Sequence, residues 1–453
     1  MGRRLRAIRS LAIDISPLRD SVPYRALWIG QIVSLIGTQM RLVAVPYQVY
    51  TITGSTVAVG FVGLVEVVPL IAFSIIGGSI ADTFDRRKVM FVATLGLMLD
   101  SIALAVLSFK GDPALWSIYA LTALGSALEA VDRPPRAAII PDLISEAQVP
   151  AALALRQVSF QLTHIAGPAM GGLIIAAFGG PGWVHAADAA TFVAVLIALR
   201  WIPKQPPRAG ERADDEGRLS MRLIKEGVRF SLRTPLISSI FVIDLIAMIF
   251  GMPRAVFPQL ADETFGLGAA GLGLLYAAPS AGALLGALTT GWVKHVRRQG
   301  IAVVVAVAVW GAAIAAAGLS LFSLLLTLTF LAIAGAADVV SAVFRGTILL
   351  EATPINLRGR VQALNLMVVS GGPRIGDLEA GLVAGAIGAG PSVVVGGLAC
   401  LVGTGVVATR VKQLRAYVAP VPLPPDRRVL GSGHVSSSEG PEPERDEGRR
   451  QQG

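Results

Sequence analysis

Apolar stretches long enough to form membrane-spanning helices follow one another from residue 27 to residue 410, separated by short polar segments. A helix rises 1.5 Å per residue, so about 20 apolar residues cross the ~30 Å hydrocarbon layer of a bilayer. The pattern predicts an all-α membrane protein with twelve spans, six on each side of a polar segment. The spans are expected at 27–50, 57–80, 89–109, 114–140, 150–178 and 183–201, and then at 236–260, 270–292, 301–318, 322–346, 359–388 and 391–410.

A glycine and proline signature occurs once in each half of the chain. The first copy is Gly167-Pro168-Ala169-Met170-Gly171-Gly172, and the second is Gly372-Pro373-Arg374-Ile375-Gly376. Proline bends a helix and glycine lets neighbouring helices approach closely. Equivalent copies therefore predict two pseudo-symmetric six-helix bundles, at 27–201 and 234–412. A duplicated bundle of this kind usually moves solutes.

Composition supports a membrane protein and argues against an enzyme. The mean hydropathy is +0.66, and 53% of residues are hydrophobic while 15% are charged, which does not suit a soluble surface. Cys400 is the single cysteine, so an intrachain disulfide is impossible and a thiolate metal site is not expected. The sequence contains no HExxH, no GxSxG and no Gly-Lys dipeptide for a phosphate loop. We therefore expect no cofactor, and an ion or solute gradient as the energy source.

Basic residues in the short loops predict the orientation. They gather in the amino-terminal segment, in the loop after the second span and in the loop after the eighth, which places both termini in the cytoplasm of a multi-pass plasma or inner membrane protein. Because this positive charge is dispersed, the net charge of +9 does not indicate nucleic-acid binding. We expect a cytoplasmic segment at 1–26, a cytoplasmic linker at 202–233 and a disordered tail at 413–453, in a protein that works as a monomer.

Ionisable residues inside the apolar spans are the candidate functional residues, because each is costly in a bilayer unless it is paired or hydrated. We expect them to line a central cavity for a small-molecule substrate and protons. The candidates are Glu66, Glu129, Asp132, Arg133, Asp244, Asp338, Arg41, Arg254 and Arg374. For any single one, a structural ion pair is an equally good interpretation. For Asp100 and Asp188 the structural interpretation is the better one.

The fourth span carries the densest group of charges. Glu129 with Arg133, and Asp132 with Arg136, have the i,i+4 spacing of helical ion pairs. Pro134 and Pro135 follow at once and are expected to break the helix and free backbone carbonyls. This combination predicts a polar site along a solute path.

The turn after the second span resembles the loop signature of the major facilitator superfamily through Gly78, Asp82, Arg86 and Arg87. Thr83 and Asp85 depart from that signature, where an arginine and a glycine are usual. The segment with Gly167, Pro168, Gly171 and Gly172 resembles the span-five motif of proton-exchanging exporters in that superfamily. Further matches at 46–49, 53–56, 59–60, 132–134 and 358–363 resemble its twelve-span branch of drug and siderophore exporters, which includes the enterobactin exporter. The resemblance covers residues 20–412.

The resemblance implies a two-domain helical fold, a central cavity and proton-driven antiport, with the turn at Gly78, Asp82, Arg86 and Arg87 latching one conformation. We accordingly expect a secondary transporter that exports a small amphipathic molecule, such as a drug, a siderophore or a secondary metabolite. Glu129 or Asp132 is the first candidate for carrying the proton, and Glu66 is the next. Two alternatives remain open at this point: an importer or uniporter of the same fold, and a receptor or scaffold that binds a ligand without moving it.

Overall fold

The computed structural model describes residues 14–204 and 225–419, and within them it is helical with no strand. Ten helical segments within these two ranges are long and apolar enough to span a membrane, which confirms the predicted all-α membrane fold class. Two further long helices, α6 (Leu115–Ala138) and α16 (Arg358–Ile387), lie beside them and carry several charges. Those two helices coincide with the predicted spans at 114–140 and 359–388.

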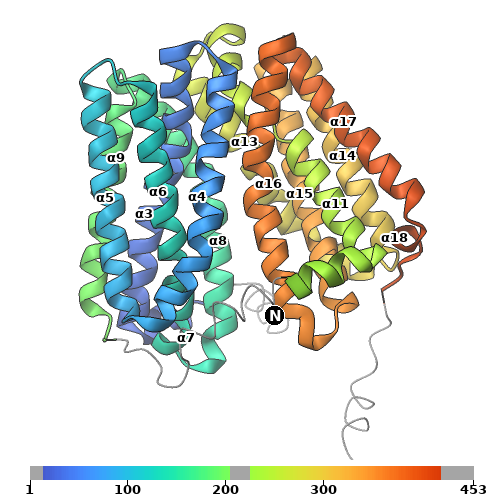
Figure 1. Ribbon diagram of the computed structural model, residues 1–453, viewed down its shortest axis with the longest axis horizontal. Coiled ribbons are helices and arrows are strands. Elements are labelled where there is room, and N and C mark those ends of the chain that lie inside the picture. The colour runs from blue at the N-terminus through green and yellow to red at the C-terminus, as the bar shows by residue number, and fades with distance from the viewer. Residues whose placement is uncertain (1–13, 205–224, 420–453) are drawn as a thin grey trace, which may run out of the picture. The chain divides into compact units, whose positions relative to one another are not determined.

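The first six long helices pack mainly against one another, and so do the last six (Figure 1). The first bundle comprises α3 (Val22–Thr53), α4 (Thr56–Thr83), α5 (Arg86–Phe109), α6, α8 (Val149–Phe178) and α9 (Gly182–Ala198). The second comprises α11 (Pro235–Phe250), α13 (Gly268–Thr289), α14 (Gln299–Leu319), α15 (Leu324–Ala352), α16 and α17 (Ala389–Arg410). By their contacts, both bundles belong to one compact unit.

Local sequence explains several helix ends. Ser21 caps α3, because its side chain accepts a hydrogen bond from the Tyr24 amide, and Pro23 occupies the first turn, where a missing N–H costs nothing. The helix ends at Gly54, whose φ of +60° is the left-handed conformation that glycine adopts without strain. The turn from α3 into α4 is therefore tight. At its other end, α3 starts at Val22, five residues before the start that the hydropathy pattern predicts.

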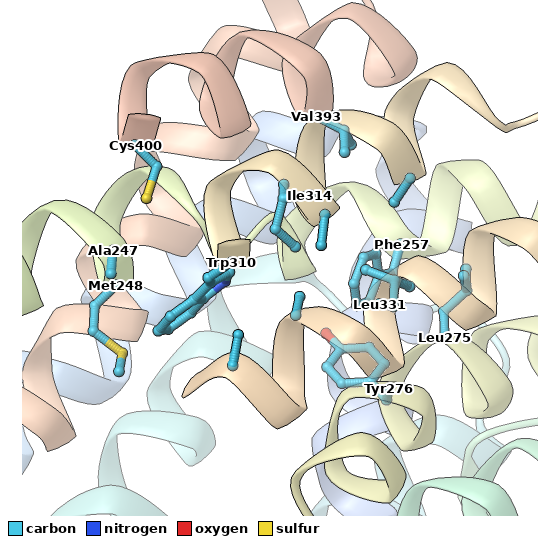
Figure 2. Packing of buried hydrophobic residues seen from close by; sticks show 14 of the residues in the cluster. Ala247, Met248, Phe257, Leu275, Tyr276, Trp310, Ile314, Leu331, Val393 and Cys400 are labelled. Carbon is cyan, nitrogen blue, oxygen red and sulfur yellow. The ribbon is translucent and has the colours of Figure 1, made fainter. Parts of the chain in front are cut away.

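Span seven is interrupted, which the hydropathy pattern did not reveal. α11 ends at Phe250 and is followed by the short helices η3 (Arg254–Val256), α12 (Phe257–Gln259) and η4 (Leu260–Thr264). Gly251 and Pro253 both disfavour a continuous helix, and the Trp310 indole N–H donates to the freed Gly251 carbonyl at 3.0 Å. Figure 2 shows Trp310 beside Ala247 and Met248 in the core of the second bundle.

Three expectations about helix boundaries were wrong. Pro134 and Pro135 do not break α6, which continues to Ala138: each removes one bond to a carbonyl four residues earlier, but the fixed φ of proline is compatible with a helix. The tail does not begin at 413, since α18 (Lys412–Ala416) packs on α11 and α14 with Leu414 fully buried. The segment predicted as a linker is helical at 225–233. Residues 1–13, 205–224 and 420–453 lie outside the described residues.

Each copy of the glycine and proline signature packs its helix against the first helix of its own bundle. A Cβ atom on Gly171 of α8 would lie 2.9 Å from the Met40 carbonyl oxygen of α3, and one on Gly376 of α16 would lie 2.8 Å from the Ile249 carbonyl oxygen of α11. Pro168 and Pro373 lie inside helices that continue past them. The signature therefore repeats because the same close approach of backbones occurs in each half.

The two bundles meet through a second pair of glycine contacts, where α8 crosses α13 and α4 crosses α16. A Cβ on Gly172 would lie 2.9 Å from the Gly273 Cα, and a Cβ on Gly381 would lie 3.0 Å from the Gly60 Cα. We call these two places the glycine crossings. All four glycines lie toward the end of the molecule where α3 ends and α4 begins, so at this end the bundles are in direct backbone contact.

Candidate functional site

An ion pair joins the two bundles next to a glycine crossing. Arg374 of α16 donates from Nε to the Glu66 carboxylate of α4 at 2.9 Å, and from Nη1 to the Ser370 carbonyl at 2.7 Å. The side chains of Arg374 and Glu66 are 19% and 23% exposed. Glu66 and Arg374 were both predicted from their place inside apolar spans, but sequence alone could not show that they pair across the interface.

Two further ion pairs lie close to this one. Glu129 accepts from Arg133 at 2.7 Å within α6, as the i,i+4 spacing predicts. Arg254 of η3 donates two hydrogen bonds to Asp377 of α16, at 2.7 and 3.2 Å. Arg374 acts electrostatically on Glu129, and Glu66 acts on both Arg133 and Arg254. The six residues form what we call the central charge cluster: Glu66, Glu129, Arg133, Arg254, Arg374 and Asp377.

The central charge cluster balances three carboxylates with three guanidinium groups from both bundles. Each carboxylate has its own arginine, so the cluster is neutral when every group is ionised. A proton or a charged solute that takes one partner of Glu66–Arg374 breaks the pair of this cluster that joins the two bundles. Within the described part of the chain, no group of three or more His, Cys, Asp or Glu residues could hold a metal ion.

Asp132 does not face this cluster in the same way. It is 5% exposed and pairs with Arg136 on its own helix, as predicted, while Arg136 also donates to the Thr94 hydroxyl of α5 at 3.1 Å. These contacts connect α6 to α5 inside the first bundle. The structural interpretation therefore suits Asp132 better than Glu129.

Arg41 and Arg254 occupy near-equivalent positions in the two halves but have different partners. Arg41 lies on the uninterrupted helix α3 and pairs with Asp100 of α5 at 2.6 Å, inside the first bundle. Arg254 lies after the interruption of span seven and reaches α16. Asp188 accepts from Ser101 at 2.7 Å, so Asp100 and Asp188 are both engaged inside the bundle, in line with their structural interpretation.

Asp244 and Asp338 meet at an arginine that sequence reasoning did not select. Arg345 of α15 lies 2.8 Å from Asp244 of α11 and 3.7 Å from Asp338, which is two helical turns earlier on α15. The seven-residue spacing between Asp338 and Arg345 was a visible signal, because it places both on one helix face.

The turn at Gly78, Asp82, Arg86 and Arg87 is described in part. Arg86 pairs with Asp142 of α7 (Ile140–Leu143) at 3.0 Å and with the Ala138 carbonyl at 3.4 Å. This contact joins the start of α5 to the end of α6, within the first bundle. The Arg87 amide donates to Asp85, and a Cβ on Gly78 would meet no atom within 4 Å. The side chain of Asp82 lies outside the described part, so its role as a latch stays a prediction.

Beyond Glu66–Arg374, a phenol–carboxylate hydrogen bond also crosses between the bundles at the glycine-crossing end. The Tyr50 hydroxyl at the end of α3 donates to Glu263 of η4, which also accepts from Gln259 at 2.9 Å. Sequence reasoning missed this contact, because it depends on the interruption of span seven that brings η4 toward α3.

Replacing Tyr50 by phenylalanine is expected to weaken closure at this end by about 1 kcal/mol, or roughly fivefold, because an exposed carboxylate partner gives only part of the energy of a charged hydrogen bond. The measurement is the maleimide labelling rate of Thr56→Cys, a buried position between α4 and α16, in a Cys400→Ala background. Tyr119→Phe is the control, because its hydroxyl bonds the Ala58 carbonyl within the first bundle. An equal rise in both variants would contradict the prediction.

Comparison with known proteins agrees with this architecture. Residues 12–422 match the family described as transmembrane secretion effectors, within the major facilitator superfamily. The chain therefore belongs to this family of membrane transporters, and it is a secondary transporter, not an enzyme. Its similarity to the enterobactin exporter EntS of Escherichia coli O1:K1 is 28% identity over 360 residues, covering 79% of this chain and 84% of that protein. EntS of Shigella boydii serotype 18 shows the same identity and coverage.

Solved structures of major facilitator transporters share the fold at low sequence identity. The nucleoside transporter NupG superposes with a TM-score of 0.69 at 13% identity, covering 86% of this chain and 98% of that one. A bacterial homologue of the human lysosomal transporter Spinster, in an inward-facing and unoccupied conformation, superposes with a TM-score of 0.68 at 14% identity, covering 90% and 100%. The fold thus agrees with the family assignment, while the cargo has to be argued from this chain.

Proposed function

We propose that this protein exports a small amphipathic molecule in exchange for protons, by alternating access between its two bundles. The observation that carries the proposal is the Glu66–Arg374 ion pair, because it joins α4 of one bundle to α16 of the other through a carboxylate that can accept a proton. Similarity to the enterobactin exporter over most of the chain supports export as the direction of transport. Proton exchange and the direction of transport are the parts that need experiment.

The cycle follows from what protonation does to this pair. With Glu66 ionised, the pair holds α4 against α16 beside the glycine crossing, and cargo enters from the opposite end. Cargo that engages Arg374 competes with Glu66 for this guanidinium, so the pair opens and cargo leaves at the glycine-crossing end, with Arg374 still beside the Ser370 carbonyl. The freed Glu66 carboxylate then takes up a proton at that end, so the bundles can close again without burying an unpaired charge. Glu66 releases the proton toward the opposite end when it pairs with Arg374 again. The proposal thus moves the proton from Glu129 or Asp132, the first candidates from sequence, to Glu66, with Glu129 adjacent.

The cargo class follows from the balanced charges of the central charge cluster. Three acids and three arginines offer partners to either sign of charge, which suits an amphipathic molecule with polar groups on an apolar body. A siderophore such as the enterobactin exported by the EntS relatives is the first candidate. A lipophilic drug cation, which would bind chiefly at the acids, is the second.

The test is transport by purified protein in lipid vesicles with an imposed pH gradient, using enterobactin and the dye cation ethidium as probes and a trapped pH indicator. We expect the pH gradient to drive accumulation of one probe and protons to move the opposite way. Movement of a probe without any dependence on the gradient would overturn proton exchange and favour a uniporter. Binding of a probe without movement would indicate a receptor.

A further inference from the structure

A second group of charges lies in the second bundle, on helices that contribute nothing to the central charge cluster. The Arg345 guanidinium of α15 lies between Asp244 of α11 and Asp338 of α15, at 2.8 and 3.7 Å. Ser341 lies between Asp338 and Arg345 on the same face of α15, three residues after one and four before the other. We call Asp244, Asp338, Ser341 and Arg345 the Arg345 cluster.

The hydrogen bonds of the Arg345 cluster are incomplete. Asp244, Ser341 and Arg345 are 1%, 0% and 4% exposed. The Ser341 hydroxyl and the Asp338 Oδ1 atom have no hydrogen-bond partner in the described part of the chain, while Asp244 Oδ1 and Arg345 Nη1 contact each other at 2.8 Å without the geometry of a hydrogen bond. Buried polar groups are normally paired, since an unpaired one loses its hydration without compensation. The cluster therefore has a hydrogen-bonding capacity that a structural ion pair would not need.

The net charge of the Arg345 cluster indicates what would complete its hydrogen bonds. Arginine keeps its proton in proteins, so two ionised aspartates would leave one uncompensated negative charge in a buried place. The charges that act on the two aspartates are Arg345 on both and Asp244 on Asp338. A single proton on one carboxyl restores neutrality and supplies an O–H donor that the Ser341 hydroxyl can accept. A calcium or magnesium ion fits poorly, because it prefers six or more oxygen ligands and would lie beside a guanidinium.

We propose that Asp244 and Asp338 share one exchangeable proton beside Arg345, so that the second bundle contains a proton-binding site of its own. The Asp338 side chain is 28% exposed, whereas Asp244 is sealed, so the proton exchanges through Asp338. A role of this site in transport rests on the proposed proton exchange, whereas its ability to bind a proton is independent of that proposal.

The first bundle offers a matched group that is closed. Asp100 pairs with Arg41 at 2.6 Å, and Asp188 acts on the same guanidinium, so this group also has two acids and one arginine. The Asp100 side chain is fully buried and Asp188 is 1% exposed. A proton held in this group has no exposed carboxyl through which to exchange. Asp188→Asn is therefore the control for the Arg345 cluster.

The experiment is infrared spectroscopy of the full-length protein in lipid vesicles during a pH titration, following the stretch of protonated carboxyl groups and its shift in D2O. We expect the pH-dependent carboxyl band of the parent to lose one component in Asp338→Asn, to keep that component in Asp338→Glu, and to be unchanged in Asp188→Asn. Asp338→Asn leaves the Asp244–Arg345 pair in place, so the variant is expected to fold, which size-exclusion chromatography checks.

Three results would overturn the inference: an undiminished band in Asp338→Asn, an equal loss in Asp188→Asn, or a band that follows sodium concentration at constant pH.

If Asp338→Asn does not fold, Ser341→Ala decides instead. It should shift the midpoint of the titration without removing the band, and an unchanged midpoint would contradict the shared proton. If the parent shows the carboxyl band but no proton-driven transport, the proposed function is wrong and the proton-binding site is retained. If transport is proton-driven but the band is undiminished in Asp338→Asn, the proton-binding site is wrong and the proposed function is retained.

Discussion

Replacing Gly172 by leucine should reduce transport by about tenfold or more, because the new side chain meets backbone at a glycine crossing. Its Cβ would lie 2.9 Å from the Gly273 Cα, and an α-helical backbone cannot move aside as a flexible side chain can. Overpacking costs about 1–3 kcal/mol, which corresponds to a shift of roughly 5- to 150-fold between conformations. The closed arrangement of this end is therefore disfavoured, and the cycle stalls. Transport of the active probe in vesicles measures the loss, and labelling of Thr56→Cys measures the opening.

Gly405→Leu is the matched control for this prediction. Gly405 lies within α17, is exposed, and has no atom within 4 Å of an added Cβ, so a leucine there extends into open space. The transport rate and the labelling rate of this variant should equal those of the parent. If both leucine variants lose transport to the same degree, close backbone contact is not the reason that the crossings need glycine.

Replacing Glu66 by glutamine should abolish the dependence of transport on the pH gradient while leaving exchange of probe across the membrane at equal concentrations. Glutamine is neutral, so the variant resembles the protein with Glu66 permanently protonated, and no proton can be released in the cycle. Arg374 also loses its carboxylate partner and keeps the Ser370 carbonyl. We expect gradient-driven transport to fall by about tenfold or more, since a broken charged pair costs about 1–3 kcal/mol when its groups are partly exposed.

Glu129→Gln separates this effect from a general loss of charge in the central charge cluster. Its partner Arg133 is on the same helix and is about half exposed, so the pair contributes only a few tenths of a kcal/mol. This variant should keep its dependence on the pH gradient. The opposite result, with Glu129→Gln uncoupled and Glu66→Gln normal, would assign the proton to Glu129. In Glu66→Gln, the further change Arg374→Gln should restore thermal stability without restoring coupling, because it removes the unpaired guanidinium.

The helices were predictable from sequence, because a bilayer imposes a length and an apolar composition on each span. The interruption of span seven was not predicted, although Gly251 and Pro253 indicate it. Mean hydropathy over a whole span is hardly changed by two residues. The helical end at Lys412–Ala416 was missed because a single buried residue, Leu414, fixes it to the bundle.

The site was predictable in its residue types and in its local pairs. The spacing within α6 gave Glu129–Arg133 and Asp132–Arg136 directly, since helical geometry fixes neighbours at i,i+4. Glu66–Arg374 and Arg254–Asp377 could not be derived, because they depend on which helices cross and at what height. Arg345 was overlooked, although its spacing from Asp338 placed the two charges on one face of α15.

Two helices that meet through backbone alone can part and rejoin without any side chain having to find its rotamer again. The α8–α13 and α4–α16 contacts are of this kind where Gly172 faces Gly273 and Gly60 faces Gly381. Opening and closing at this end therefore need not wait for rotamer changes, whereas a seam of larger interlocking side chains would have to separate and repack in every cycle.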